Sequence, residues 1–142
     1  MTHLEDSLGF ILVRAARGMK RALDSELSGI GITASQHAVL SALGHEDGLS
    51  LTQIANRIFL DNPATTGLVD RLEKDSLVER QRISTDRRVI NIYLTKKGNN
   101  LLSIIDNIAT NIDRNITSVL SQSELTTLRD FLIRIWDKSN NR

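Results

Sequence analysis

The spacing of hydrophobic and polar residues along the chain predicts a mainly helical protein with a small sheet. From about residue 4 to 30, and in two stretches between about 96 and 139, apolar residues recur at intervals of three and four, as on one face of an α-helix. The segments LVERQRI (77–83) and VINIYLT (89–95) have strand character, with Ile90, Ile92 and Leu94 on one face. The polar run STDRR between them predicts the tip of a β-hairpin.

Helix starts are marked by capping boxes, in which a serine or threonine accepts the amide of the third helical residue, whose side chain returns to the cap amide. The pairs with this spacing are Thr33 with Gln36, Ser50 with Gln53, and Ser121 with Glu124. They predict a helix over about 33–43 that ends at Gly44, a short helix over LTQIANRI (51–58), and a last helix from about residue 121.

A fourth helix is expected to begin with Asn62 as its cap and Pro63 at its first position, where the missing N–H of proline costs nothing. Because a short turn joins it to the preceding helix, the two form a helix-turn-helix candidate. A helical wheel turns Ala64, Thr65, Leu68 and Leu72 toward the core, and Asn62, Pro63, Thr66, Gly67, Asp70 and Glu73 outward. The neutral start of the outer face suits entry into a DNA major groove, although a merely solvated face has the same composition.

Charge is nearly balanced over the chain but concentrated at the hairpin. The 18 basic and 17 acidic side chains give a formal net charge of +1. Residues 80–97, however, hold Arg80, Arg82, Arg87, Arg88, Lys96 and Lys97 against Asp86 alone. Asp86 is placed to pair with Arg88 and to aim its guanidinium, which suits a narrow and strongly negative minor groove. A charged tip that only improves solubility is the competing interpretation.

Residues 50–98 resemble the winged helix-turn-helix core of the multiple antibiotic resistance regulator (MarR) family. LVDRLEK, LVER, DRR before apolar strand residues, and LTKKG carry the resemblance, and GITASQHAVLSAL resembles the family's second helix. The resemblance implies a homodimeric transcription factor, usually a repressor, whose terminal helices interlock. Its recognition helices would enter successive major grooves of a pseudo-palindromic operator, and its wings would reach the flanking minor grooves.

The resemblance also implies roles for single residues. Thr65 and Thr66 match positions that read bases or phosphates, Asn62 and Pro63 match the helix entry, and Asp86 with Arg88 matches the wing pair. The predicted DNA-binding residues are Ser50, Gln53, Asn62, Pro63, Thr65, Thr66, Asp86, Arg87 and Arg88. The chain departs from the family at Gly67, where a long polar residue is common, and at Ser76, where glycine is common. If Ser76 must adopt the left-handed conformation, the serine costs on the order of 1 kcal/mol.

Family members commonly bind a small aromatic or phenolic effector between the dimer helices and the DNA-binding lobe. Arg14 and Arg17 are the candidates for such a contact here, against the alternative of solvent exposure or salt bridges with neighbours. We expect no cofactor and no metal, because cysteine is absent and His3, His37 and His45 lack the close spacing of a metal site. An enzyme is not expected, since neither a phosphate-binding loop nor a pair of catalytic carboxylates stands out.

Together these patterns predict an α+β fold that is mainly α with a small β-hairpin wing. We expect a single domain over 1–142, with a winged helix-turn-helix lobe at about 33–96 and dimerisation helices at about 4–30 and 96–139. The long apolar stripes would leave an exposed patch on a lone chain, which favours a homodimer. The lack of a membrane-length apolar stretch favours a cytoplasmic location. The predicted function is a homodimeric repressor that binds double-stranded DNA. A winged helix used only for protein association is the alternative.

Overall fold

The computed structural model describes residues 3–83 and 85–141, apart from the side chains of Ile83 and Arg87. The chain divides into two compact units, Met1–Ala109 and Thr110–Arg142. Helix α5 (Lys96–Thr117) begins in the first unit and ends in the second. Helices dominate the described residues and the strands form a small antiparallel sheet, which confirms the predicted α+β class. The expectation of a single domain stays a prediction.

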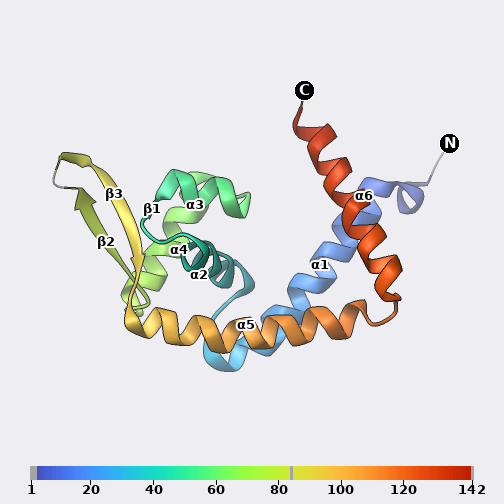
Figure 1. The fold of residues 1–142 in the computed structure, drawn as a ribbon, viewed down its shortest axis with the longest axis horizontal. Helices are drawn as coiled ribbons and strands as arrows, with labels where there is room; N and C mark the ends of the chain where they lie inside the picture. Colours follow the sequence, from blue (N-terminus) through green and yellow to red (C-terminus); the bar gives the residue numbers. More distant parts are fainter. Residues whose placement is uncertain (1–2, 84, 142) are drawn as a thin grey trace. The chain divides into compact units, whose positions relative to one another are not determined.

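The predicted helices and the hairpin occur in the predicted order, with two short 3-10 helices and the strand β1 in addition (Figure 1). The elements of the first unit are η1 Leu4–Asp6, α1 Leu8–Leu27, η2 Ser28–Ile30, α2 Ala34–His45, β1 Leu49–Ser50, α3 Leu51–Ile58, α4 Asn62–Lys74, β2 Val78–Ile83, β3 Asp86–Leu94 and the first part of α5. The second unit holds the end of α5 and helix α6, Gln122–Asn140.

The three predicted capping boxes are all present, at the starts of α2, α3 and α6. The predicted end of the second helix at Gly44 is wrong, because α2 continues to His45. A Cβ at Gly44 would lie only 2.5 Å from Leu102 Cδ2 on α5. This glycine therefore serves close helix packing rather than helix termination.

The sheet has the order β1-β3-β2, so β3 is central and β2 lies at an edge. The two-residue strand β1 was not predicted, since it is too short to show a pattern; its Leu49 is opposite Ile92 of β3. Strands β2 and β3 form the predicted hairpin, which extends beyond α3 and α4 (Figure 1). Asp86 and Arg88 belong to β3, whereas the sequence had suggested that they lie in the connecting tip.

The core of the first unit lies where α2, α3 and α4 meet the sheet, the end of α1 and the start of α5. Its fully buried members include Leu27, Val39, Leu40, Ile54, Val69, Leu72, Ile92 and Ile105. Ile90 and Leu94 are half-buried against this core, on the same face of β3 as Ile92, as predicted. Burial of this apolar surface holds the lobe together, at roughly 25 cal/mol per Å².

A tight joint connects α4, the hairpin and α5. Ser76 has a φ of 61°, so the serine does occupy the left-handed conformation. Thr95 Oγ1 donates a hydrogen bond to the Ser76 carbonyl (2.7 Å) and accepts one from the Gly98 amide (3.0 Å). A Cβ at Gly98 would overlap the carbonyl oxygen of Leu77. The LTKKG motif thus lets the start of α5 lie directly against the base of the hairpin.

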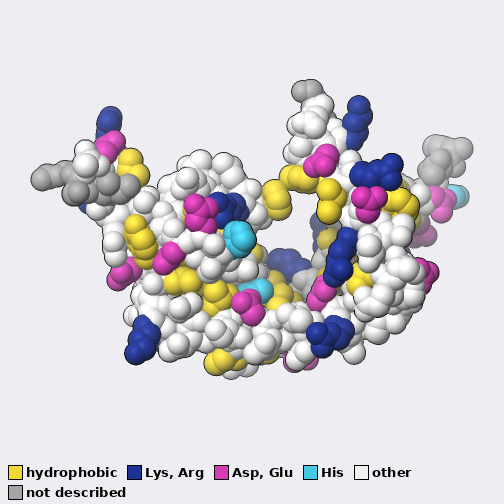
Figure 2. Space-filling view, viewed as in Figure 1, with side chains coloured by type: hydrophobic (Ala, Val, Ile, Leu, Met, Phe, Trp, Pro, Cys, Tyr) yellow, Lys and Arg dark blue, Asp and Glu magenta, His cyan; other side chains and the backbone are white. Residues whose placement is uncertain are grey.

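The second unit differs in its burial. Among the described residues of α6, none is buried. Leu125 is half-buried, and the other large apolar side chains of α6 are exposed: Leu128, Phe131, Leu132, Ile133, Ile135 and Trp136. Hydrophobic side chains along α6 are visible in Figure 2. Nowhere in residues 3–83 or 85–141 is a helix both long and apolar enough to cross a bilayer.

Candidate nucleic-acid interface

Helices α3 and α4 are joined by a three-residue turn, Phe59 to Asp61, and form the predicted helix-turn-helix. Phe59 takes the left-handed conformation (φ 59°) and its amide donates to the Ala55 carbonyl, which ends α3. At the start of α3, Gln53 Oε1 accepts the Ser50 amide at 2.9 Å and Ser50 Oγ accepts the Gln53 amide at 3.2 Å. The cap leaves the exposed NH₂ group of Gln53 available to a phosphate.

The predicted cap of α4 is wrong by one residue. Asp61, and not Asn62, caps the helix, because Asp61 Oδ1 accepts the Ala64 amide at 2.7 Å. A carboxylate also interacts more favourably than an amide with the positive end of the helix. Asn62 is therefore free of capping, and its Nδ2 lies 3.4 Å from Thr52 Oγ1 on α3. Asn62 and Pro63 are both exposed at the helix entry, as expected for a groove-facing pair.

The two threonines of α4 have different environments. Thr66 is half-buried and its hydroxyl donates to the Asn62 carbonyl at 2.9 Å. Thr65 is fully buried and its hydroxyl donates to the Asp61 carbonyl at 2.8 Å, so its side chain cannot reach a duplex. The helical wheel had turned Thr65 inward, as the structure shows, and the direct DNA contact that the resemblance implied would require its side chain to leave the core. Ala64 is exposed, and Val69 takes the inward place that the helical wheel had given to Ala64.

The acidic residues of α4, which the helical wheel had turned outward, are paired with an arginine of the hairpin. Arg80 on β2 donates from Nη1 to Glu73 Oε1 and from Nη2 to Asp70 Oδ1, each at 2.6 Å. Partial burial lowers the pKa of Arg80, but hydrogen bonds and charge attraction from both carboxylates outweigh it, so this pKa is raised. The sequence contained one signal of this network, a basic residue on the strand that follows two acids spaced by one helical turn.

The predicted wing pair is present on β3. Asp86 Oδ1 accepts the Arg88 backbone amide at 3.0 Å and lies 3.3 Å from Arg88 Nε. The Arg88 side chain is nevertheless 91% exposed. The carboxylate thus holds the base of the guanidinium while its terminal nitrogens extend from the hairpin. The side chain of Arg87, also predicted to bind DNA, lies outside the described part of the structure.

His37 and the acidic loop after α2 have structural partners. His37 Nε2 lies 2.9 Å from Asp106 Oδ1, which links α2 to α5. In the loop after α2, Glu46 accepts a hydrogen bond from Arg57, and Asp47 Oδ1 accepts the Leu94 amide at 3.0 Å. Within the described ranges 3–83 and 85–141, no group of three or more potential metal ligands comes together.

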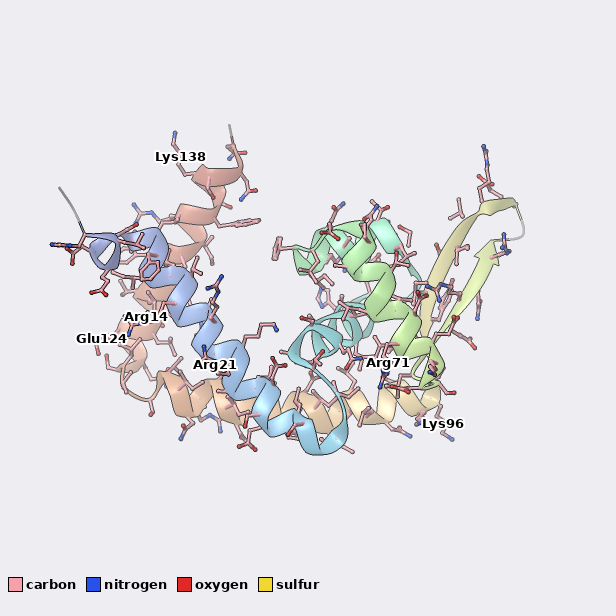
Figure 3. All side chains as sticks on the ribbon, turned by 180° about the vertical axis from the view of Figure 1, so that it is seen from behind. Arg14, Arg21, Arg71, Lys96, Glu124 and Lys138 are labelled. Carbon is pink, nitrogen blue, oxygen red and sulfur yellow. The ribbon has the colours of Figure 1, made fainter. Side chains whose placement is uncertain are left out.

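The two effector candidates lie on α1. Arg14 and Arg17 are exposed, and Figure 3 shows Arg14 on the surface of the helix. Neither arginine has a salt bridge to the described residues. Both side chains are exposed, and their role in effector binding stays a prediction.

A helix-turn-helix followed directly by a hairpin with an aimed arginine defines a winged helix-turn-helix protein. A family model described as MarR family matches residues 32–90. The HTH-type transcriptional regulator MhqR of Bacillus subtilis is 35% identical over 136 residues, which cover 95% of this chain and 93% of MhqR. The chain belongs to the MarR family, as its motifs had indicated.

Further similarities agree with this assignment. The HTH-type transcriptional regulator TtmR of Methylorubrum extorquens is 39% identical over 103 residues, which cover 72% of this chain and 53% of TtmR. The chain thus spans about half the length of that relative. The crystal structure of the S. aureus MepR–DNA complex has a TM-score of 0.85 and 25% identity, over 93% of this chain and 98% of that chain. Because its relatives are transcriptional regulators, the protein is a regulator and not an enzyme.

Proposed function

We propose that this protein is a homodimeric repressor that binds a pseudo-palindromic operator in double-stranded DNA. Support comes from the similarity to MepR, which was crystallised in complex with DNA. In this proposal the N-terminal end of α4 enters the major groove with Asn62, Pro63 and Thr66, while Ser50 and Gln53 at the start of α3 approach phosphates. The half-sites of the two subunits lie about one helical turn apart, roughly 10 bp.

The observation that carries the proposal is the exposure of Arg88 beside Asp86. An arginine whose base is fixed and whose terminal nitrogens are free loses little conformational entropy when it enters a minor groove. Thr65 keeps an indirect role, since its buried hydroxyl fixes the first turn of the recognition helix.

Dimerisation is supported by the exposed apolar side chains of α1 and α6. On α1 they include Leu8, Ile11 and Val13, and on α6 they include Leu128, Phe131 and Leu132. Exposed apolar surface of this extent marks protein interaction sites. We propose that a second copy of the chain covers these helices.

The proposed effector is a small aromatic or phenolic acid whose carboxylate pairs with Arg14 or Arg17. Salicylate-like compounds should then stabilise the protein by about 1–2 kcal/mol when they exceed their Kd by roughly tenfold. The shift in Tm should disappear in Arg14→Gln/Arg17→Gln. An unchanged Tm with every aromatic carboxylate would remove this class of effector and leave the DNA-binding proposal intact.

The test of DNA binding is selection of genomic fragments by the purified protein. The wild type should enrich a pseudo-palindromic site, and Arg88→Ala should bind that site about ten- to hundredfold more weakly. Arg88→Lys should recover only part of the loss, because lysine lacks the planar fork. Lys20→Gln, which also removes one exposed positive charge next to an acid, should bind like the wild type. Recovery of nothing above background at low salt would instead favour a protein-association module.

A further inference from the structure

The C-terminal half of the recognition helix carries two acids, Asp70 and Glu73. Their side chains are 61% and 42% exposed, so both are accessible to solvent. Asp70 lies one helical turn after Thr66, on the face that the proposed function directs toward DNA. A phosphate within a Debye length, about 8 Å at physiological salt, would be repelled by an uncompensated carboxylate there. Without a compensating positive charge, this part of α4 would therefore lower the affinity for DNA.

Arg80 meets both acids from the neighbouring strand. The two terminal guanidinium nitrogens each donate to a different carboxylate, at 2.6 Å. Its backbone amide donates to Glu73 Oε2 at 3.2 Å. Because β2 is the edge strand of the sheet, this amide would otherwise need water as its partner. One residue thus ties the hairpin to the recognition helix by backbone and side chain together.

Two arginines of the hairpin, Arg80 and Arg88, are arranged in opposite ways. The Arg80 side chain is only 22% exposed and both terminal nitrogens are engaged. Arg88 is 91% exposed and is held only at Nε. A phosphate that captured Arg80 would have to break two charge-assisted hydrogen bonds, whereas a phosphate that captured Arg88 would break none at its terminal nitrogens.

We propose that Arg80 is a positioning residue that masks Asp70 and Glu73 from the DNA phosphates and fixes the angle of the wing on α4. It raises DNA affinity without touching DNA. The inference rests on the proposed function and deepens it, because it assigns Arg80 to the recognition helix rather than to the DNA.

A double-mutant cycle separates masking from direct contact. The duplex is the site enriched by the wild type, and the variants are Arg80→Gln, Asp70→Asn/Glu73→Gln, and the triple variant with all three changes. Asp70→Asn and Glu73→Gln keep the side-chain size, and the side-chain carbonyl that Glu73→Gln introduces would still accept the Arg80 backbone amide. Arg80→Gln shortens the side chain and removes its charge. Affinities are measured per folded protein, with the folded fraction taken from urea denaturation of each variant.

Arg80→Gln should weaken binding by about tenfold or more in the wild-type background, since it exposes two acids to the phosphates. In the Asp70→Asn/Glu73→Gln background the same change should lower DNA affinity less than about threefold, because no negative charge remains to be masked. Arg80→Lys, which keeps the charge, should bind closer to the wild type than Arg80→Gln does. A purely structural role would change the free energy of unfolding but leave the affinity of the folded protein unaltered.

The outcomes are distinct. If Arg80→Gln lowers DNA affinity equally in both backgrounds, Arg80 contacts DNA itself. If it leaves the affinity unchanged, the acids do not oppose binding. Either result overturns this inference but not the proposed function. If Arg80→Gln does not fold, Asp70→Asn/Glu73→Gln decides the matter. Masking predicts that it binds at least as tightly as the wild type, because the Asn and Gln carbonyls still accept from Arg80 and hold the wing while the negative charges are gone. A tenfold loss would show that the carboxylates themselves favour binding and would overturn the inference. Failure of the wild type to bind any duplex would overturn the proposed function and the inference together.

Discussion

The two compact units of the chain begin their helices with the same device but differ in what those helices cover. Capping boxes start α2 and α3 in the first unit and α6 in the second. Helices α2 and α3 bury residues in a core, whereas no described residue of α6 is buried. Local sequence signals therefore determine where a helix forms, but not what it packs against. The first unit contains its own core, and α6 requires a surface from elsewhere, which the proposed function supplies as a second subunit.

The largest expected effect comes from placing a charge on the exposed apolar face of α6. Leu132→Glu should convert the proposed dimer into a monomer, because an unpaired carboxylate in a packed interface costs about 3–5 kcal/mol. Sedimentation at micromolar concentration measures this directly. Thr126→Glu is the matched control, since it adds the same charge at an exposed polar position of the same helix. A monomeric wild type, or a Leu132→Glu variant that sediments as a dimer, would contradict the assignment of this face.

The next test concerns the joint at the base of the hairpin, where the first unit leaves no free space. Gly98→Ala should destabilise the protein by about 1–3 kcal/mol, because the new Cβ would meet the Leu77 carbonyl and force the backbone to shift. Urea denaturation gives the change in the free energy of unfolding.

Gly67→Ala is the control for the same substitution in another helix. A Cβ at Gly67 would meet no atom within 4 Å, so alanine should stabilise α4 by about 1 kcal/mol through its higher helix propensity. If Gly98→Ala lowers the free energy of unfolding and Gly67→Ala raises it, packing and not helix propensity governs the joint. If both variants are more stable than the wild type, the start of α5 must be able to move away from the Leu77 carbonyl.

A smaller gain is expected from Ser76→Gly, within the same joint. The serine adopts φ 61°, a conformation that glycine occupies without steric cost, so the variant should be more stable by about 1 kcal/mol. Its urea midpoint should rise at an unchanged m-value. Ser76→Ala serves as the control, since alanine keeps the Cβ and should give no such gain. A loss of stability in Ser76→Gly would mean that the serine side chain contributes a contact of its own.

Much of the fold and part of the interface could be predicted from the sequence, because their causes are local. The capping boxes, the Asp86–Arg88 pair and the strain at Ser76 each depend on residues a few positions apart. What was missed depends on tertiary contacts. The Arg80 network joins a strand to a helix seven and ten residues away, and β1 exists only because β3 pairs with it. Burial of Thr65 agrees with the helical wheel, which turned this residue toward the core, whereas the resemblance alone had implied a DNA contact for it.

The smallest expected effect is a pH dependence that the capping box of α6 should show and the capping boxes of the first unit should not. In α6 the third helical residue is Glu124, whose pKa is lowered because its carboxylate accepts hydrogen bonds from the Ser121 backbone and side chain. The contribution of Glu124 to helix stability should therefore be present above its unfolded pKa and lost as the pH falls through the lower folded pKa. The boxes of α2 and α3 use Gln36 and Gln53 and should lack this dependence. An NMR titration of the Glu124 carboxyl measures the pKa. Glu124→Gln should keep the cap and remove the acid-induced decrease in the stability of α6. A Glu124 pKa at the ordinary value would mean that the α6 cap is open in solution.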